Sequence, residues 1–83
     1  MMQQDNIQAV LAELLERVAK VDRAAVARDK RLQEDLGIDS LSLIDLAVAT
    51  EDAFAIGIPD EDLERFQTVG DVVDHIRRCK VAA

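Results

Sequence analysis

Residues 35–41 read Asp35-Leu36-Gly37-Ile38-Asp39-Ser40-Leu41 and mark the point where the middle of the chain turns into a helix. Gly37 allows the backbone to turn tightly, and the apolar residues after Ser40 recur at helical spacing. Serine and aspartate are common at helix starts because their oxygens accept hydrogen bonds from free backbone N–H groups. Taken alone, Asp39 or Ser40 could be a simple cap; either way, the stretch places one serine hydroxyl at a helix start.

The acidic residues are concentrated in one part of the chain. Residues 34–64 contain ten of the seventeen acidic residues and none of the ten basic ones. The ten are Glu34, Asp35, Asp39, Asp45, Glu51, Asp52, Asp60, Glu61, Asp62 and Glu64. Such a distribution disfavours nucleic acid and anionic membranes as partners, and it favours proteins with basic docking surfaces.

The length and composition indicate one small helical domain covering residues 1–83. Eighty-three residues leave no adequate core for two domains. The apolar content of 49% is nearly all aliphatic, with two Phe and no Trp or Tyr, which favours packed helices. One cysteine and one histidine cannot form an internal disulfide or a metal site. Neither a secretory signal nor the ~20 apolar residues needed to cross a bilayer is present, so we expect a cytoplasmic protein. We also expect a monomer.

Helical periodicity identifies a first helix over about residues 5–19 and a long loop over 20–39. One face of that helix is formed by Ile7, Val10, Leu11, Leu14, Leu15 and Val18. In the loop, Val21, Val26 and Leu32 are expected to pack on the core, and residues 24–27 could form a helical turn. A loop of this length in so small a domain often carries function.

A second helix is predicted over about residues 40–54, with two apolar stripes. One stripe comprises Leu43, Leu46, Ala47, Thr50 and Phe54. The other comprises Leu41, Ile44 and Val48, with Asp45 and Asp52 beside it. The periodicity leaves open whether the second stripe is buried between helices or forms a protein-docking surface rimmed by carboxylates.

Two further helices complete the predicted fold. Gly57 and Pro59 interrupt the pattern, and residues 60–65 are long enough only for a short helix. A last helix over 68–80 opens with Thr68, and Asp71 three residues later matches the capping pattern. The fold class is therefore all-α, a small four-helix bundle of three main helices and one short helix.

The residues predict no self-contained active site. His75, the only histidine, is interpreted as a surface or boundary residue, and Cys79 as a small apolar residue at the helix edge. The three glycines are too far apart to form a phosphate-binding loop. A serine nucleophile needs a base, so a hydrolase pairing Ser40 with His75 is the weakest alternative, and we expect that the chain is not an enzyme.

The ordered set of motifs resembles the acyl carrier proteins. The resemblance is carried by the segments Glu34-Asp35-Leu36-Gly37-Ile38-Asp39-Ser40-Leu41, Ile44-Asp45-Leu46, Ile58-Pro59-Asp60-Glu61 and Thr68-Val69-Gly70-Asp71. Phe54 at the end of the second helix and the loop residues Val26 and Leu32 fit the same pattern. The resemblance covers nearly the whole chain.

This resemblance implies a covalent cofactor and a set of partners. A phosphopantetheinyl transferase, using coenzyme A and Mg²⁺, would attach 4′-phosphopantetheine to Ser40, and Asp39 would help to position the serine during modification. The thiol of the arm would then carry acyl groups as thioesters between acyl-loading, condensing and chain-processing enzymes with basic docking patches. The residues implied in partner binding are Leu41, Ile44, Asp45, Val48, Glu51 and Asp52.

The pathway and the class of cargo stay open at this point. Ser42 and Ala53 stand where many fatty-acid carriers have acidic residues, so fatty-acid synthesis, polyketide synthesis and other specialised acyl pathways all remain. An aminoacyl or peptidyl carrier is a neighbouring alternative, although the acidic second helix favours acyl cargo. A different class is an acidic protein-interaction module whose serine stays unmodified.

Overall fold

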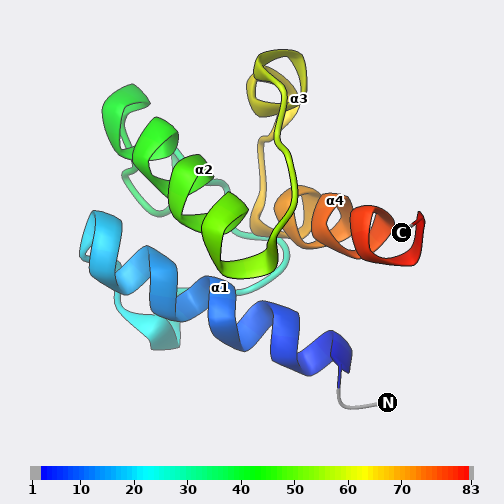
Figure 1. The fold of residues 1–83 in the computed structure, drawn as a ribbon. Helices are drawn as coiled ribbons and strands as arrows, with labels where there is room; N and C mark the ends of the chain where they lie inside the picture. Colours follow the sequence, from blue (N-terminus) through cyan, green and yellow to red (C-terminus); the bar gives the residue numbers. More distant parts are fainter. Residues whose placement is uncertain (1–2, 83) are drawn as a thin grey trace.

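The computed structural model describes residues 3–82, which form four α-helices joined by loops (Figure 1). These are α1 (Gln3–Ala19), α2 (Ser40–Phe54), α3 (Asp60–Arg65) and α4 (Val69–Ala82), with a 3-10 turn η1 (Arg23–Ala25) in the loop after α1. Within these residues there is no strand, only an isolated bridge between Arg31 and Thr68. The predicted all-α fold class is confirmed. None of the helices described is long and apolar enough to cross a membrane.

The core lies where α1 meets α2 and α4. The inner face of α1 is the apolar stripe that its periodicity predicts, and α1 packs against both other long helices. The core residues with the least exposure are Leu11, Leu15, Leu32, Val69, Val73 and Ile76. These side chains come from α1, the long loop and α4, and Leu46 adds a buried residue from α2, so the core connects all three long helices.

The ends of α2 are set by capping residues on both sides. Asp39 is the N-cap, and its Oδ1 accepts a hydrogen bond from the Ser42 N–H at 2.8 Å. Ala55 ends the helix in the left-handed conformation, with φ of 56°. Inside the helix, the buried Thr50 hydroxyl donates to the Leu46 carbonyl oxygen at 2.7 Å, so its polar group is satisfied without a partner outside the helix.

Backbone hydrogen bonds fix the long loop to the start of α4. The Leu32 N–H donates to the Gln67 carbonyl at 2.8 Å, and the Val69 N–H donates to the Lys30 carbonyl at 3.0 Å. Leu32 and Val21 are buried, and Val26 is partly buried against the core. The three loop residues therefore pack on the core as the sequence predicts.

Charged side chains add a second connection between this loop and α4. The guanidinium of Arg28 donates to both oxygens of Asp74, at 3.2 and 3.1 Å.

The start of α4 is capped by a reciprocal pair of hydrogen bonds, in which Thr68 Oγ1 accepts from the Asp71 N–H and Asp71 Oδ2 accepts from the Thr68 N–H. This confirms the capping interaction predicted for these two residues, although α4 itself begins one residue later, at Val69.

The interpretation of His75 as a surface or boundary residue is wrong. Its side chain is buried, with 7% relative exposure, and it packs beside Ile76 on the inner side of α4. The physical reason is helical spacing, because residue 75 lies three positions after Val72 and four before Cys79. Those positions share one face, so the ring points inward with them.

Candidate functional site

Ser40 is the first residue of α2 and is exposed. The cap of the helix is supplied by the preceding residue, because Asp39 makes the hydrogen bond to Ser42. The N–H group of Ser42 also lowers the pKa of the Asp39 carboxyl, since this hydrogen bond favours the ionised form. Asp39 therefore holds the first turn in place, and Ser40 is left as an accessible hydroxyl at the positive end of the helix dipole.

The turn before Ser40 is attached to the core through the buried residue Ile38. Gly37 has φ of 68°, a left-handed conformation that suits glycine. The next residue, Ile38, is buried in the core, and its N–H donates to the Leu32 carbonyl at 3.0 Å. Because Ile38 is buried and hydrogen-bonded two positions before it, Ser40 is held close to the core.

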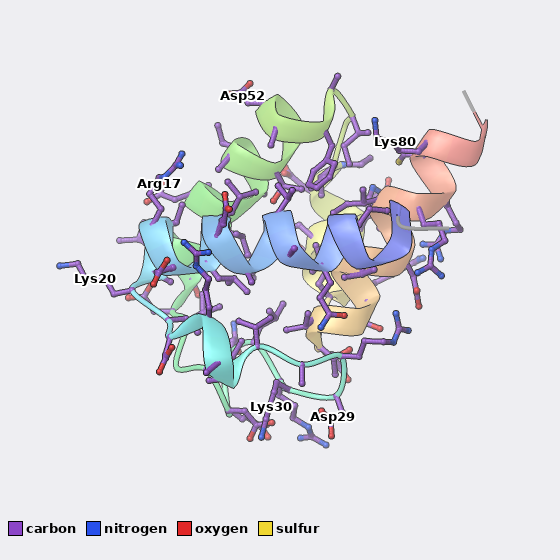
Figure 2. All side chains as sticks on the ribbon, turned by 90° about the horizontal axis from the view of Figure 1, so that it is seen from below. Arg17, Lys20, Asp29, Lys30, Asp52 and Lys80 are labelled. Carbon is purple, nitrogen blue, oxygen red and sulfur yellow. The ribbon has the colours of Figure 1, made fainter. Side chains whose placement is uncertain are left out.

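The second apolar stripe of α2 faces solvent. Leu41, Ile44 and Val48, here called the α2 ridge, have relative exposures of 74%, 51% and 53%. Asp45 and Asp52 are exposed beside the ridge, and Figure 2 shows Asp52 pointing outward from the end of α2. The sequence left open whether this stripe is buried between helices, and the structure shows that it is exposed.

Glu51 differs from the other acidic residues of α2. Its Oε2 accepts a hydrogen bond of 2.7 Å from the backbone N–H of Ile58, and its side chain is half-buried. The carboxylate therefore connects the end of α2 to the segment before α3. This contact is internal, which sets Glu51 apart from the exposed Asp45 and Asp52.

Ser40 opens onto a cavity of about 640 Å³ between α2, α3 and the long loop. Its apolar wall includes Leu43 from α2 and Leu63 and Phe66 from the α3 region. The polar residues around it are Arg31, Gln33, Glu34, Asp60, Glu64 and Gln67. The cavity gives a group attached at Ser40 a partly apolar space to lie in.

Sequence reasoning did not identify most of this lining. Arg31 and Gln33 come from the long loop, on either side of the buried Leu32, and Phe66 comes from the far side of α3. Both polar residues are exposed and lie on a hydrogen-bonded turn, in which the Asp35 N–H donates to the Arg31 carbonyl at 2.9 Å. No periodic pattern in the sequence indicates that this turn lies beside Ser40.

No basic residue lies on α2 itself. Figure 2 shows Lys20 at the end of α1 and Lys30 on the loop, both away from Asp52 of α2. Arg31 is nearer to Ser40, but its guanidinium donates to Glu34 at 2.6 Å. The α2 surface therefore keeps the acidic character that its sequence predicts.

The structure does not bring His75 to Ser40. The Nε2 atom of His75 lies 3.1 Å from the Gly57 carbonyl oxygen and 3.5 Å from the sulfur of Cys79. Cys79 is half-buried, as expected for the edge of the last helix. In the part of the chain that the structure describes, no group of His, Cys, Asp and Glu residues could hold a metal ion.

Comparison with known proteins gives consistent matches over most of the chain. The family described as a phosphopantetheine attachment site matches residues 9–76. A meromycolate extension acyl carrier protein from Mycolicibacterium smegmatis is 47% identical over 77 residues, covering 93% of this chain and 78% of that protein. An acyl carrier protein from Rhodococcus erythropolis is 43% identical, covering 93% of this chain and 85% of that protein.

A solved structure shows the same fold. It is reported as an acyl carrier protein from Mycobacterium tuberculosis and superimposes with a TM-score of 0.81 at 32% sequence identity. The superposition covers 87% of this chain and 96% of the other. The similarity therefore extends to the arrangement of the helices around the cavity, and is not limited to the short serine motif.

Proposed function

Because the chain belongs to the phosphopantetheine-binding family of acyl carrier proteins, we propose that Ser40 is the residue that bears its 4′-phosphopantetheine arm. The protein carries acyl groups, and the family match implies that they are held as thioesters on this covalent arm. The thiol at the end of the arm supplies the thioester chemistry. The protein residues supply the attachment point, its orientation and the surfaces that partner enzymes contact.

Elimination among the hydroxyl groups supports Ser40. The chain has two serines, two threonines and no tyrosine. Thr50 is buried and bonded to Leu46, and Thr68 caps α4 through Asp71. Ser42 is half-buried two positions further into α2, so Ser40 is the hydroxyl that an enzyme can reach most readily.

The position also suits the chemistry of attachment. During modification, the Ser40 oxygen would form a bond to the phosphorus of coenzyme A that bears the pantetheine. The bond from that phosphorus to the bridging oxygen of the pyrophosphate would break, and adenosine 3′,5′-bisphosphate would leave with that oxygen. The serine proton would pass to a base on the transferase. The phosphodiester would then stand at the N-terminus of α2, where an anion is stabilised by the helix dipole and the free N–H groups. Asp39 would position Ser40 by holding the first turn.

Measurement of the intact mass tests this proposal directly. The purified apo chain is incubated with a phosphopantetheinyl transferase, Mg²⁺ and coenzyme A. We expect the wild type and Ser42→Ala each to gain one phosphopantetheinyl mass, and Ser40→Ala to gain none. Modification of Ser40→Ala, or no modification of any folded variant by several competent transferases, would overturn the proposal.

Partner enzymes are proposed to dock on the α2 ridge and its acidic border. The ridge offers apolar contact area, while Asp45 and Asp52 attract basic surfaces over a longer distance. This combination favours fast and reversible association, which a carrier that visits several enzymes requires. We further propose that the carrier is a cytoplasmic monomer and catalyses no reaction itself.

The mycobacterial relatives, named for meromycolate extension, suggest the first cargo to test. We propose extension of long acyl chains as the pathway, and the partly apolar cavity beside Ser40 is compatible with an aliphatic cargo. Loading of the holo protein by acyl-activating and amino-acid-activating enzymes distinguishes the alternatives. Acceptance of aminoacyl groups alone would show an aminoacyl carrier instead.

A further inference from the structure

The short helix α3 has few contacts of its own. It has six residues, none of them buried, and its N-cap Pro59 makes no side-chain capping hydrogen bond. Figure 1 shows α3 standing apart from the three long helices, joined to α2 and α4 by two extended segments. Its position must therefore depend on contacts made by residues in and around those segments.

One side chain of α4 contacts both segments. The Nε2 atom of His75 lies 3.1 Å from the carbonyl oxygen of Gly57, before α3. The ring of His75 meets the ring of Phe66, after α3, edge-on at 67° with centroids 5.5 Å apart. A single buried imidazole therefore connects α4 to the chain on both sides of α3.

The hydrogen bond also fixes the proton on the ring. A carbonyl oxygen can only accept, so Nε2 carries the hydrogen and donates it to Gly57. The other nitrogen, Nδ1, faces α3 itself, where Asp62 Oδ2 lies 3.9 Å away. The sulfur of Cys79 is 3.5 Å from Nε2 on the α4 side. Of these contacts, the one to Gly57 is the closest and is made to backbone.

The same region forms one wall of the cavity at Ser40. Leu63 and Phe66 supply apolar lining, and Asp60 and Glu64 stand at its edge. Phe66 belongs to both places, because it lines the cavity and its ring contacts the ring of His75. Displacement of Phe66 and the adjoining α3 would therefore change this wall of the cavity. The contacts of His75 are thus connected to the space beside the attachment point.

We propose that His75 is a positioning residue that holds the two segments flanking α3 to α4, and so keeps the α3 wall of the cavity beside Ser40 in place to shelter a bound acyl group. The sheltering part rests on the proposed function, whereas the effect on α3 does not. His75 touches neither the serine nor the cavity. It acts through Phe66 and through the backbone at Gly57.

Hydrogen exchange of backbone amides tests the effect on α3. In His75→Ala, we expect the amides of Leu63 and Phe66 to exchange at least about tenfold faster, because a local opening no longer has to break the imidazole contacts. His75→Gln keeps an N–H donor at a similar reach and should recover most of the protection. Cys79→Ser leaves the Gly57 contact in place and should exchange like the wild type.

A matched control separates local opening from general destabilisation. Leu14→Ala removes a buried side chain from α1, far from α3 in sequence, and lowers global stability. Comparison is made at denaturant concentrations where Leu14→Ala and His75→Ala have the same global free energy of unfolding. If both variants then speed exchange of Leu63 and Phe66 equally, or if His75→Ala leaves these amides unchanged, His75 has no special role in holding α3.

The second readout is the reactivity of a bound thioester. Holo protein of each variant is loaded with an octanoyl group, and cleavage by hydroxylamine is followed by intact mass. We expect roughly tenfold faster cleavage in His75→Ala than in the wild type and Leu14→Ala, in proportion to the greater opening of the cavity. Equal cleavage rates would overturn the sheltering role. Failure of the wild type to accept an arm would contradict the proposed function instead, and the exchange data would still be interpretable.

Discussion

Asp39 caps α2 from the position directly before Ser40, with 2.8 Å between its Oδ1 and the Ser42 nitrogen. The two roles at this helix start are therefore divided between neighbours. The carboxylate satisfies the backbone, and the serine hydroxyl does not have to. A serine that served as the cap would have its oxygen committed to the helix, whereas here the helix is closed without it.

We predict that the Asp39 cap weakens as the carboxyl is protonated. Its pKa is lowered from the ordinary value of 3.8 chiefly by the hydrogen bond from the Ser42 N–H. A lowered pKa in the folded state means that the contribution to stability is present above pH 3.8 and is lost as the pH falls through the folded-state pKa. Titration of the side chain by NMR should show the lowered value.

Two variants of Asp39 separate capping from charge. Asp39→Asn keeps a capping oxygen and should preserve most of the stability while losing its pH dependence in the acid range. Asp39→Ala should lower the denaturation midpoint and slow modification of Ser40, because the first turn loosens. An unchanged midpoint in Asp39→Ala would show that the cap is unimportant.

We predict that Asp45 affects docking and not folding. Asp45→Lys should slow association with a partner enzyme at low salt, and the difference should shrink as ionic strength rises. Its free energy of unfolding should stay within about 0.5 kcal/mol of the wild type, as is usual for exposed surface positions. Stopped-flow binding at several salt concentrations measures the first effect, and urea denaturation measures the second.

Asp29→Lys is the matched control for this experiment. It makes the same change in net charge on an exposed loop residue, which Figure 2 shows away from Asp52 of α2. If Asp29→Lys slows association as much as Asp45→Lys does, then the total charge of the carrier matters and the acidic border of the α2 ridge does not.

Glu51 should behave differently from Asp45. Because its Oε2 accepts the Ile58 N–H at 2.7 Å in a half-buried setting, Glu51→Ala should destabilise the protein by about 1–2 kcal/mol. Glu51→Gln retains an acceptor oxygen and should lose much less. Hydrogen exchange at the Ile58 amide locates the effect, which should be faster in the alanine variant. Equal stability of Glu51→Ala and wild type would place Glu51 with the purely exposed acids.

The contrast between Asp45 and Glu51 shows how far sequence patterns reach. The bounds of α2 and its two apolar stripes follow from local spacing and capping, and these are properties of neighbouring residues. The partner of Glu51 is a backbone N–H in the irregular segment before α3, seven residues away. Helical periodicity does not specify such a contact, so the sequence gives no sign that Glu51 and Asp45 have different roles.

His75 and the cavity show two different reasons for a missed feature. The spacing of His75 from Val72 and Cys79 indicates an inward direction, whereas the residue type decides nothing, because histidine is intermediate between buried and exposed residue types. The sequence does not indicate the cavity lining, because Gln33, Phe66 and Leu43 line one cavity only once the loop and α3 have packed beside α2. Tertiary packing decides such a site.

The two faces of α2 make a direct test of burial. Leu46 has 2% relative exposure, so Leu46→Ala should destabilise by about 2–5 kcal/mol through lost burial and the cavity it leaves. Val48 lies two positions away on the exposed ridge, and Val48→Ala should cost less than about 0.5 kcal/mol. Urea denaturation measures both. Similar losses in the two variants would mean that α2 is rotated from the orientation described.

Gly70 gives a prediction opposite to ordinary helix propensity. Replacing an exposed glycine inside a helix by alanine usually stabilises by up to about 1 kcal/mol. Gly70 is buried, however, and a Cβ there would lie 3.1 Å from the Arg28 carbonyl oxygen and 3.2 Å from its Nη2. The carbonyl cannot easily move, because it accepts the Gly70 N–H at 2.9 Å.

Gly70→Ala should therefore destabilise the protein, by about 1–2 kcal/mol, as the loop is pushed away from α4. It should also disturb the ion pair of Arg28 with Asp74, whose hydrogen bond lowers the pKa of the Asp74 carboxyl. NMR titration should then show the Asp74 pKa rising toward its ordinary value, so that Asp74 loses stabilising influence at a higher pH than before. Arg28→Ala should raise the same pKa and, by removing the guanidinium contact, reduce the additional loss caused by Gly70→Ala. A stabilised Gly70→Ala with an unchanged Asp74 pKa would show that the loop yields freely, and that the close approach of Arg28 to α4 contributes nothing to the fold.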